Sequence, residues 1–155
     1  MDLKNDAQTP LSQVLAGKAR GTATLSVPPG VTVAAAAEVL NQHKIGSLLV
    51  MDGDRLVGIF TERDVLRRVV GERRDPATTR VADVMTRELV VMRPSASVLD
   101  AMRVIAEKRI RHVPVVENGA VLGVVSQGDL NHWLVRSREG QIQDLVDFVT
   151  GKYPA

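Results

Sequence analysis

Two stretches of the sequence place a hydroxyl and a carboxylate three residues apart, directly after an apolar run. Residues 58–64 read GIFTERD and residues 123–129 read GVVSQGD, so Thr61 precedes Asp64 and Ser126 precedes Asp129. This spacing is that of a capping box, which closes the start of a helix. The N–H groups of a helix start also attract phosphate, and a carboxylate one turn into the helix can accept both hydroxyl protons of a ribose. Capping and sugar-phosphate binding are compatible interpretations.

The two stretches belong to an internal repeat. A shift of 65 positions places residues 45–70 over residues 110–135 without a gap, and Gly58 and Asp64 fall on Gly123 and Asp129. Such a repeat indicates that one supersecondary unit is used twice. We predict an α+β fold in which the two copies form a pseudo-twofold pair, each covering the apolar face of the other.

Each copy is predicted to run strand, helix, strand, strand, helix. In the second copy, residues 89–92 are expected to form the first strand, and the capping box of Ser97 and Asp100 opens the next helix. Thr32 has the corresponding place in the first copy. The helices that follow Thr61 and Ser126 carry apolar stripes, from which we expect a homodimer face: Val65, Val69, Leu130, Trp133 and Leu134.

Turn signals define a hairpin in each copy. Asp-Gly separates the apolar runs 48–51 and 56–60, and Asn-Gly separates 113–116 and 121–125. Both dipeptides between β-branched runs strongly favour hairpins.

The organisation expected along the chain has five parts. These are a flexible N-terminus (1–10), the first repeat (11–70), a linker with Pro76 (71–80), the second repeat (81–136), and a C-terminal amphipathic helix and tail (137–155). The tail has Ile142, Leu145, Val146 and Val149 at helical spacing.

Composition excludes several classes of protein. The 155 residues include no cysteine, so disulfides, Cys-ligated zinc, iron–sulfur clusters and thiol nucleophiles are ruled out. No apolar run reaches the length of a membrane helix, and the first residues lack a secretory signal. We therefore expect a cytoplasmic protein without a membrane partner.

Catalytic and metal-binding patterns are missing as well. The sequence has no nucleophile elbow, no phosphate loop, no dinucleotide fingerprint and no zinc-protease motif. The three histidines, His43, His112 and His132, have no metal-ligand spacing. We expect neither an enzyme nor a metal site.

The doubled unit, its hairpins and its G-h-h-[ST]-x-x-[DN] endings together resemble the cystathionine-β-synthase (CBS) domain pair, or Bateman module. The RHVPVV stretch at 111–116 is typical of the family's second copy, and residues 12–15 and 81–86 resemble its short lead-in helices. The likeness spans about residues 11–136 and is greatest to bacterial stand-alone pairs.

The resemblance implies a regulatory sensor of adenosine-containing ligands: AMP, ADP or ATP, with NAD(H) or S-adenosylmethionine as further candidates. Asp64 and Asp129 would hold ribose hydroxyls, while Thr61 and Ser126 would bond to phosphate or ribose. Arg63 would pair with phosphate, and Arg111 would reach phosphate in the site that contains Asp64. Apolar walls for the base would come from Ile59 and Val124, and backbone groups near Thr24 and Leu89 would read its edge.

The copies differ in charge at the candidate sites. Arg63 of the first copy corresponds to Gly128, and Gly46-Ser47 corresponds to Arg111-His112. We expect unequal affinities, with the Thr61/Asp64 site holding the more highly phosphorylated ligand. Ser47 and His112 complete the set of candidate binding residues.

Two other functions stay open at this point. One is an interaction scaffold with vestigial sites. The other is a nucleic-acid-binding module that uses the basic cluster at residues 67–74, although the net charge of +2 and the scarcity of aromatic residues disfavour it. In the sensor interpretation, ligand occupancy would act on the protein's own assembly or on an unidentified partner protein.

Overall fold

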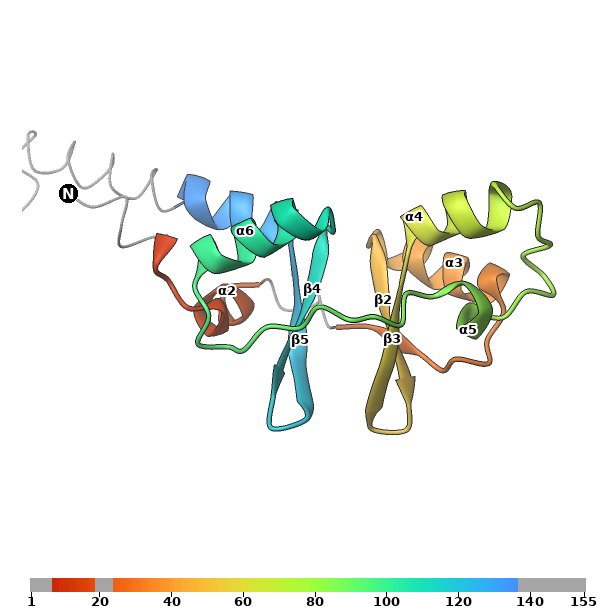
Figure 1. Ribbon diagram of the computed structural model, residues 1–155, viewed down its shortest axis with the longest axis horizontal. Helices are drawn as coiled ribbons and strands as arrows, with labels where there is room; N and C mark the ends of the chain where they lie inside the picture. The colour runs from red at the N-terminus through yellow and green to blue at the C-terminus, as the bar shows by residue number, and fades with distance from the viewer. Residues whose placement is uncertain (1–6, 19–23, 137–155) are drawn as a thin grey trace, which may run out of the picture. The chain divides into compact units, whose positions relative to one another are not determined.

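The computed structural model describes residues 7–18 and 24–136. Their contacts divide the chain into two compact units, each drawn with its own helices and hairpin in Figure 1. The Asp64 unit comprises Arg20–Val91 with Val116–Gly123. The Asp129 unit comprises Met1–Ala19, Met92–Val115 and Val124–Ala155. The mixed helix and strand content confirms the predicted α+β class.

The Asp64 unit is a small sheet covered by helices. Its elements are β1 (Ser26–Val27), α3 (Val33–His43), β2 (Ser47–Asp52), β3 (Arg55–Thr61), α4 (Glu62–Asp64), η1 (Val65–Val70) and α5 (Val81–Val84). β1 runs parallel to β2, which pairs antiparallel with β3. The core joins side chains of α3, both hairpin strands, η1 and α5, with Phe60 fully buried at its centre. Burial of this apolar surface is the main stabilising term for the unit.

The Asp129 unit repeats this plan. Its elements are α2 (Leu11–Ala16), α6 (Val98–Lys108), the hairpin of β4 (His112–Glu117) and β5 (Ala120–Ser126) apart from its tip at 116–123, and a helix at residues 127–136. α6 begins with the capping box predicted for Ser97 and Asp100. The core combines residues of α2, α6, both strands and the last helix, and Leu11, Val98 and Leu130 are fully buried in it.

The two hairpin turns have the positive φ angles that their sequences predict. Gly53 has φ +59° in the first turn. Asn118 and Gly119 have φ of 50° and 80° in the second, the pattern that a two-residue type I′ turn requires. The predicted hairpins are confirmed, each strand extending one residue beyond its apolar run at both ends.

The second helix of the first copy is not a regular α-helix. After the single turn of α4, residues Val65–Val70 form the π-helix η1, and the N–H of Gly71 donates to the carbonyl of Leu66. A Cβ at Gly71 would lie 2.6 Å from the Arg67 carbonyl oxygen. Glycine therefore allows the wide turn to close, because any side chain would collide with the backbone.

Each lead-in helix packs on the opposite repeat. α2 begins the first repeat but joins the core of the Asp129 unit, where the N–H of Leu11 donates to the Ala96 carbonyl at 2.8 Å. α5 begins the second repeat but joins the core of the Asp64 unit. There Ile59 and Thr86 exchange both backbone hydrogen bonds, at 3.0 and 2.9 Å. The structural units and the sequence copies are thus different divisions of the chain.

Two expectations from the sequence need correction. Residues 89–92 form no strand, because only Met92 bridges to Val115 while the exposed Val91 and the following turn at Pro94 leave the rest unpaired. Val69 and Leu130, offered above for a dimer face, are buried in the cores of their own units. The predicted C-terminal helix and most of the flexible N-terminus lie outside the described residues.

Gly58 supplies a test of how α5 packs on the first repeat. A Cβ there would lie 3.0 Å from Cγ of the buried Met85 and 3.1 Å from the Thr86 carbonyl oxygen, so Gly58→Ala forces the lead-in segment away from β3. We expect this overpacking to lower the free energy of unfolding by about 1–3 kcal/mol, measured by urea denaturation. Gly30→Ala is the control, since nothing lies within 4 Å of its Cβ. Equal effects of the two substitutions would contradict the close packing.

Candidate functional site

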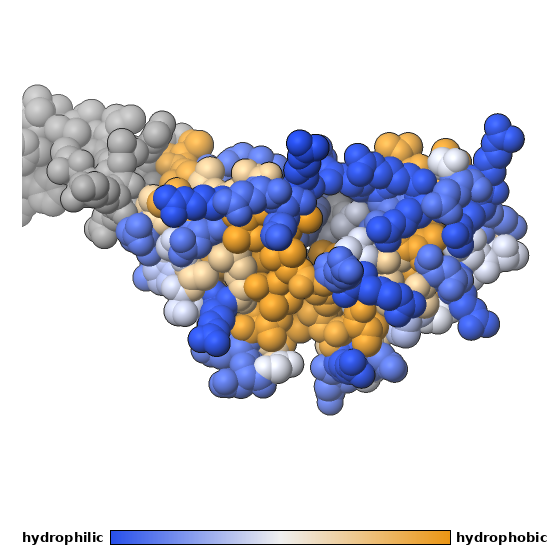
Figure 2. Space-filling model, in the orientation of Figure 1, coloured by the Kyte–Doolittle hydropathy of each residue, from blue (hydrophilic) through white to orange (hydrophobic). Residues whose placement is uncertain are grey.

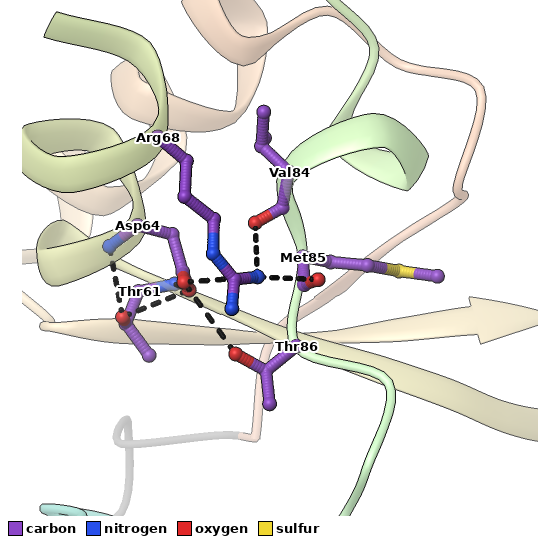
Figure 3. A network of polar contacts seen from close by, with 6 residues as sticks. All are labelled: Thr61, Asp64, Arg68, Val84, Met85 and Thr86. Carbon is purple, nitrogen blue, oxygen red and sulfur yellow. Dashed lines mark hydrogen bonds and ion pairs between the residues drawn. The ribbon is translucent and has the colours of Figure 1, made fainter. Parts of the chain in front are cut away.

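The strand–helix junction of the first copy is closed by the predicted capping box. The Thr61 hydroxyl accepts from the Asp64 N–H at 3.3 Å. Asp64 Oδ2 in turn accepts from the Thr61 N–H at 2.9 Å and from the Thr61 hydroxyl at 3.0 Å (Figure 3). β3 passes directly into α4, so these two side chains satisfy backbone groups that no loop residue could reach.

The other oxygen of Asp64 faces the lead-in segment of the second repeat. Oδ1 lies 3.5 Å from the Thr86 hydroxyl, which donates to it, and 3.6 Å from the guanidinium of Arg68. The same Arg68 nitrogen donates to the carbonyls of Val84 and Met85 at 2.9 and 2.8 Å (Figure 3). Asp64 is therefore only 6% exposed, and its carboxylate is connected through Arg68 to the end of α5.

The second junction has the same box with a different cation. The Ser126 hydroxyl accepts from the Asp129 N–H at 3.1 Å, and Asp129 Oδ2 accepts from the Ser126 N–H and hydroxyl at 2.7 and 2.8 Å. Lys18, just after α2, brings its ammonium to 2.8 Å from the same oxygen and donates to the Val124 carbonyl at 2.6 Å. The carboxylate thus has three donors on one oxygen.

These contacts set the protonation of Asp129. Burial alone would raise the pKa of this carboxyl, but the hydrogen bonds from the Lys18 ammonium and from Ser126 outweigh it. The pKa of Asp129 consequently lies below its ordinary value, and the carboxylate is charged at neutral pH. The Asp129 carboxylate is therefore a negatively charged acceptor that suits hydroxyl or ammonium donors.

A backbone contact makes the two junctions equivalent. The N–H of Glu62 donates to the Gly46 carbonyl at 3.2 Å, and at the corresponding place in the second copy the N–H of Gln127 donates to the Arg111 carbonyl at 2.9 Å. Each contact ties the helix start to the residue just before the first hairpin strand. The internal repeat thus extends to the geometry of the candidate sites.

A third capping box shows what capping alone requires. Ser97 and Asp100 make the same three hydrogen bonds at the start of α6, and Asp100 is exposed. The Ser97 hydroxyl and N–H hold the pKa of Asp100 below its usual value. Its carboxylate has no cation from a lead-in segment among the ion pairs of the described residues. Burial and a bridging cation are therefore additional features of Asp64 and Asp129.

The candidate residues divide between the two units. The Asp64 unit holds Thr24, Ser47, Ile59, Thr61, Arg63, Asp64 and Leu89, and the Asp129 unit holds Arg111, His112, Val124, Ser126 and Asp129. Ser47 lies opposite Thr61 in the hairpin register, and Ile59 is buried beside the junction. Thr24 is exposed and precedes β1. The reach of Arg111 towards the site that contains Asp64 stays a prediction, since the two residues belong to different units.

Sequence reasoning missed Lys18, Arg68 and Thr86 as neighbours of the carboxylates. Arg68 had a readable signal, because an Asp and an Arg four residues apart on a helix face each other. Lys18 and Thr86 had none, because the lead-in segments lie outside the gap-free repeat and pack on the opposite copy.

Three further features of the described residues concern metal ions, membranes and the basic cluster. Within residues 7–18 and 24–136 no cluster of three His, Asp or Glu side chains is placed to hold a metal ion. In the same residues no helix has the length and apolar character needed to cross a bilayer. In the basic cluster at 67–74, Arg68 is engaged with α5 and Arg74 pairs with Glu72 at 2.9 Å.

Comparison with known families decides what the doubled unit is. The CBS domain model matches residues 22–71 and 81–136. The chain belongs to the CBS domain family. It carries a tandem CBS pair, as the sequence predicted.

Individual relatives are also CBS proteins. The chain is 36% identical over 127 residues to the CBS domain-containing protein CBSX3, mitochondrial, of Arabidopsis thaliana, covering 79% of this chain and 62% of that protein. The solved CBS-domain containing protein ATU1752 from Agrobacterium tumefaciens has a TM-score of 0.74 at 34% identity, with 84% and 99% of the two chains covered. A hexameric CBS-CP12 protein from bloom-forming cyanobacteria has a TM-score of 0.69 at 28% identity, with 80% and 71% covered.

Membership defines the general function. CBS pairs are commonly regulatory modules that bind ligands, and CBS domain proteins such as these relatives are generally not enzymes.

The low pKa of Asp129 predicts a pH dependence that an amide lacks. We expect Asp129→Asn to lower the free energy of unfolding at pH 7 by about 1 kcal/mol, through loss of a partly buried ion pair with Lys18. A carboxyl whose pKa is depressed by folding stabilises above its unfolded pKa of about 3.9, and this contribution is lost as the pH falls through the folded value. The difference between variant and parent should therefore shrink below about pH 4 in urea denaturation. A difference constant from pH 7 to pH 2 would contradict the assignment.

Proposed function

We propose that this CBS pair is a sensor of adenosine-containing ligands, with Asp64 and Asp129 as the acceptors of ribose hydroxyls. One observation carries the proposal: two equivalent strand–helix junctions each present a carboxylate that is more enclosed than a cap requires. The exposed Asp100 makes the same capping hydrogen bonds. Its exposure supports a second role for the other two.

The chemistry of the junction suits a sugar with vicinal hydroxyls. A carboxylate is an acceptor with two oxygens, so it can bind both hydroxyl protons of a ribose. Such bonds are stronger than neutral ones because the acceptor is charged. Thr61 and Ser126 lie at the same edge and supply further hydroxyl groups for ribose or phosphate.

The remaining roles follow the family resemblance. Ile59 and Val124 would flank the base, backbone groups near Thr24 and Leu89 would read its edge, and Arg63 and Arg111 would meet phosphate. Ser47 and His112, which begin β2 and β4, would line the two sites. AMP, ADP and ATP are the first candidates, in the cytoplasmic setting expected from the sequence.

We also propose that the module acts as a homodimer. Leu66 and Val70, four residues apart in η1, are 65% and 62% exposed. In Figure 2, apolar surface over the α4–η1 helix is bordered by hydrophilic side chains. A second copy would remove these side chains from water, and assembly of the hexameric CBS-CP12 relative supports self-association. Ligand occupancy would then bias this assembly or a partner protein, because a binding module can act only by shifting populations.

A thermal-shift panel tests the sensor proposal. We expect AMP, ADP, ATP, NAD or S-adenosylmethionine to raise the melting temperature, and guanosine nucleotides not to. A ligand at about 100 times its Kd stabilises the folded state by about 2.7 kcal/mol. At ~2–4 °C per kcal/mol for a chain of this size, the shift is several degrees.

The three capping boxes supply matched variants for this panel. Asp64→Ala and Asp129→Ala should each reduce the ligand response, whereas Asp100→Ala should lower the melting temperature of the free protein and keep the response. If all three variants responded like the parent, the two carboxylates would be caps alone. A parent without any response would favour a scaffold with vestigial sites.

The dimer proposal is tested at the exposed face of η1. Leu66→Glu and Val70→Glu should each halve the molar mass in light scattering after size-exclusion chromatography, because burying an unpaired charge costs several kcal/mol. Leu122→Glu is the control, since Leu122 is a 49% exposed apolar residue of β5. A monomeric parent, or dimers in all three variants, would contradict the proposed face.

A further inference from the structure

The two junctions present the same pair of acceptors to a lead-in segment, but the donors differ. In the Asp64 unit the Ile59 carbonyl accepts from the Thr86 N–H at 2.9 Å, and the Asp64 carboxylate accepts from the Thr86 hydroxyl at 3.5 Å. In the Asp129 unit the corresponding acceptors, the Val124 carbonyl and the Asp129 carboxylate, both bind the Lys18 ammonium. One charged side chain thus does what a backbone group and a hydroxyl do in the other copy.

These donors differ in how easily they can be exchanged. Thr86 is fixed, because its N–H and carbonyl both pair with Ile59. Lys18 reaches its acceptors through a flexible four-carbon stem, and its side chain and that of Asp129 are 23% and 26% exposed. A ligand hydroxyl can therefore replace the ammonium on Asp129 without breaking a backbone ladder.

We propose that Lys18 determines the ligand specificity of the Asp129 site, favouring a phosphorylated adenosine over the neutral nucleoside. In the free protein its ammonium occupies the carboxylate that the ribose needs. When ribose hydroxyls bind Asp129, the ammonium turns to the phosphate of the same ligand. This inference rests on the proposed function, and it adds a residue to which neither the repeat nor the family resemblance assigns a role.

Charge balance gives the direction of the preference. A neutral nucleoside displaces Lys18 and leaves its ammonium without the carboxylate, so the lost ion pair weakens binding. A monophosphate offers a new anion to the displaced ammonium and restores a charge-assisted hydrogen bond. Such a bond corresponds to about a tenfold or larger difference in Kd.

This assignment narrows the difference between the two sites that the sequence suggests. The second copy has Gly128 at the position of Arg63, which predicts the weaker attraction for phosphate. Lys18, which lies outside the aligned repeat, places its ammonium 2.8 Å from the Asp129 carboxylate and so adds a positive charge to that junction. We therefore expect the Asp129 site to discriminate more strongly for phosphate than its own repeat sequence indicates.

Calorimetric titration with AMP and with adenosine tests this proposal. The parent is an Asp64→Asn variant, so that the Asp129 site is measured alone. Its amide oxygen can still accept the capping hydrogen bond from the Thr61 N–H. Adding Asp129→Ala to this parent gives the reference that lacks both sites. We expect the parent to bind AMP at least about tenfold more tightly than adenosine. Lys18→Met should reduce this ratio to about one, with AMP bound more weakly and adenosine more tightly.

Two further variants separate specificity from structure. Lys18→Arg keeps a cation and should keep the preference, whereas Lys108→Met removes an exposed lysine of the same unit and should change neither Kd. Circular dichroism verifies that each variant is folded, and Lys18→Gln replaces Lys18→Met if the latter is not.

The possible outcomes are distinct. A Lys18→Met variant that keeps the tenfold preference, or that loses affinity for both ligands equally, overturns the role of Lys18 and leaves the proposed sensor function intact. If the Asp64→Asn parent binds neither AMP nor adenosine while the unmodified protein binds one of them, this inference alone falls. If the unmodified protein binds none of the adenosine-containing ligands of the thermal-shift panel, the sensor function and this inference fall together. Loss of the preference in Lys18→Met with rescue in Lys18→Arg supports both.

Discussion

The immediate passage from a hairpin strand into a helix is the constraint on which both candidate sites depend. Because β3 runs directly into α4, and β5 directly into the helix at 127–136, the first N–H groups of each helix have no loop residues to satisfy them. A hydroxyl at the strand end and an aspartate three residues later solve this problem, at Thr61 and Asp64 and again in the second copy. The solution leaves a charged carboxylate at each junction, and a carboxylate in such a place needs further donors.

Those donors come from the exchanged lead-in segments. The segment after α5 supplies Thr86, the carbonyls of Val84 and Met85 at the end of α5 accept from Arg68, and the segment after α2 supplies Lys18. Each carboxylate is therefore in contact with the lead-in segment of the other repeat. A ligand that donated hydrogen bonds to Asp64 would weaken the interaction of Asp64 with Arg68, and Arg68 holds the end of α5. Two side chains, Asp64 and Arg68, would thus connect a bound sugar to the backbone of a lead-in helix.

The sequence predicted the parts of this arrangement that are local. Asp-Gly and Asn-Gly determined both hairpins, and hydroxyl–carboxylate spacing determined all three capping boxes, because each depends on residues at most four apart. The π-helix after Asp64 was not predictable from apolar periodicity, since Val65 and Val69 fit an α-helix equally well. The contacts of Lys18 could not be predicted for a different reason. Its acceptors are distant in the sequence, and its segment lies outside the gap-free repeat alignment. The packing of a lead-in helix on the opposite copy depends on tertiary contacts, and no local sequence pattern predicts it.

The two copies differ in the residue that stands one helical turn after each site aspartate. Arg68 of the first copy corresponds to Trp133 of the second. Arg68 donates from its helix to the carbonyls at the end of α5, whereas Trp133 packs against the segment after α2. A Cβ at Gly17 would lie 3.1 Å from the Trp133 ring. An indole carries no charge and cannot form an ion pair with Asp129. In the second copy the cation at the carboxylate is Lys18, the residue after the glycine against which the ring lies. A tryptophan on the helix and a lysine on the lead-in segment of the second junction thus stand where the first junction has a single arginine.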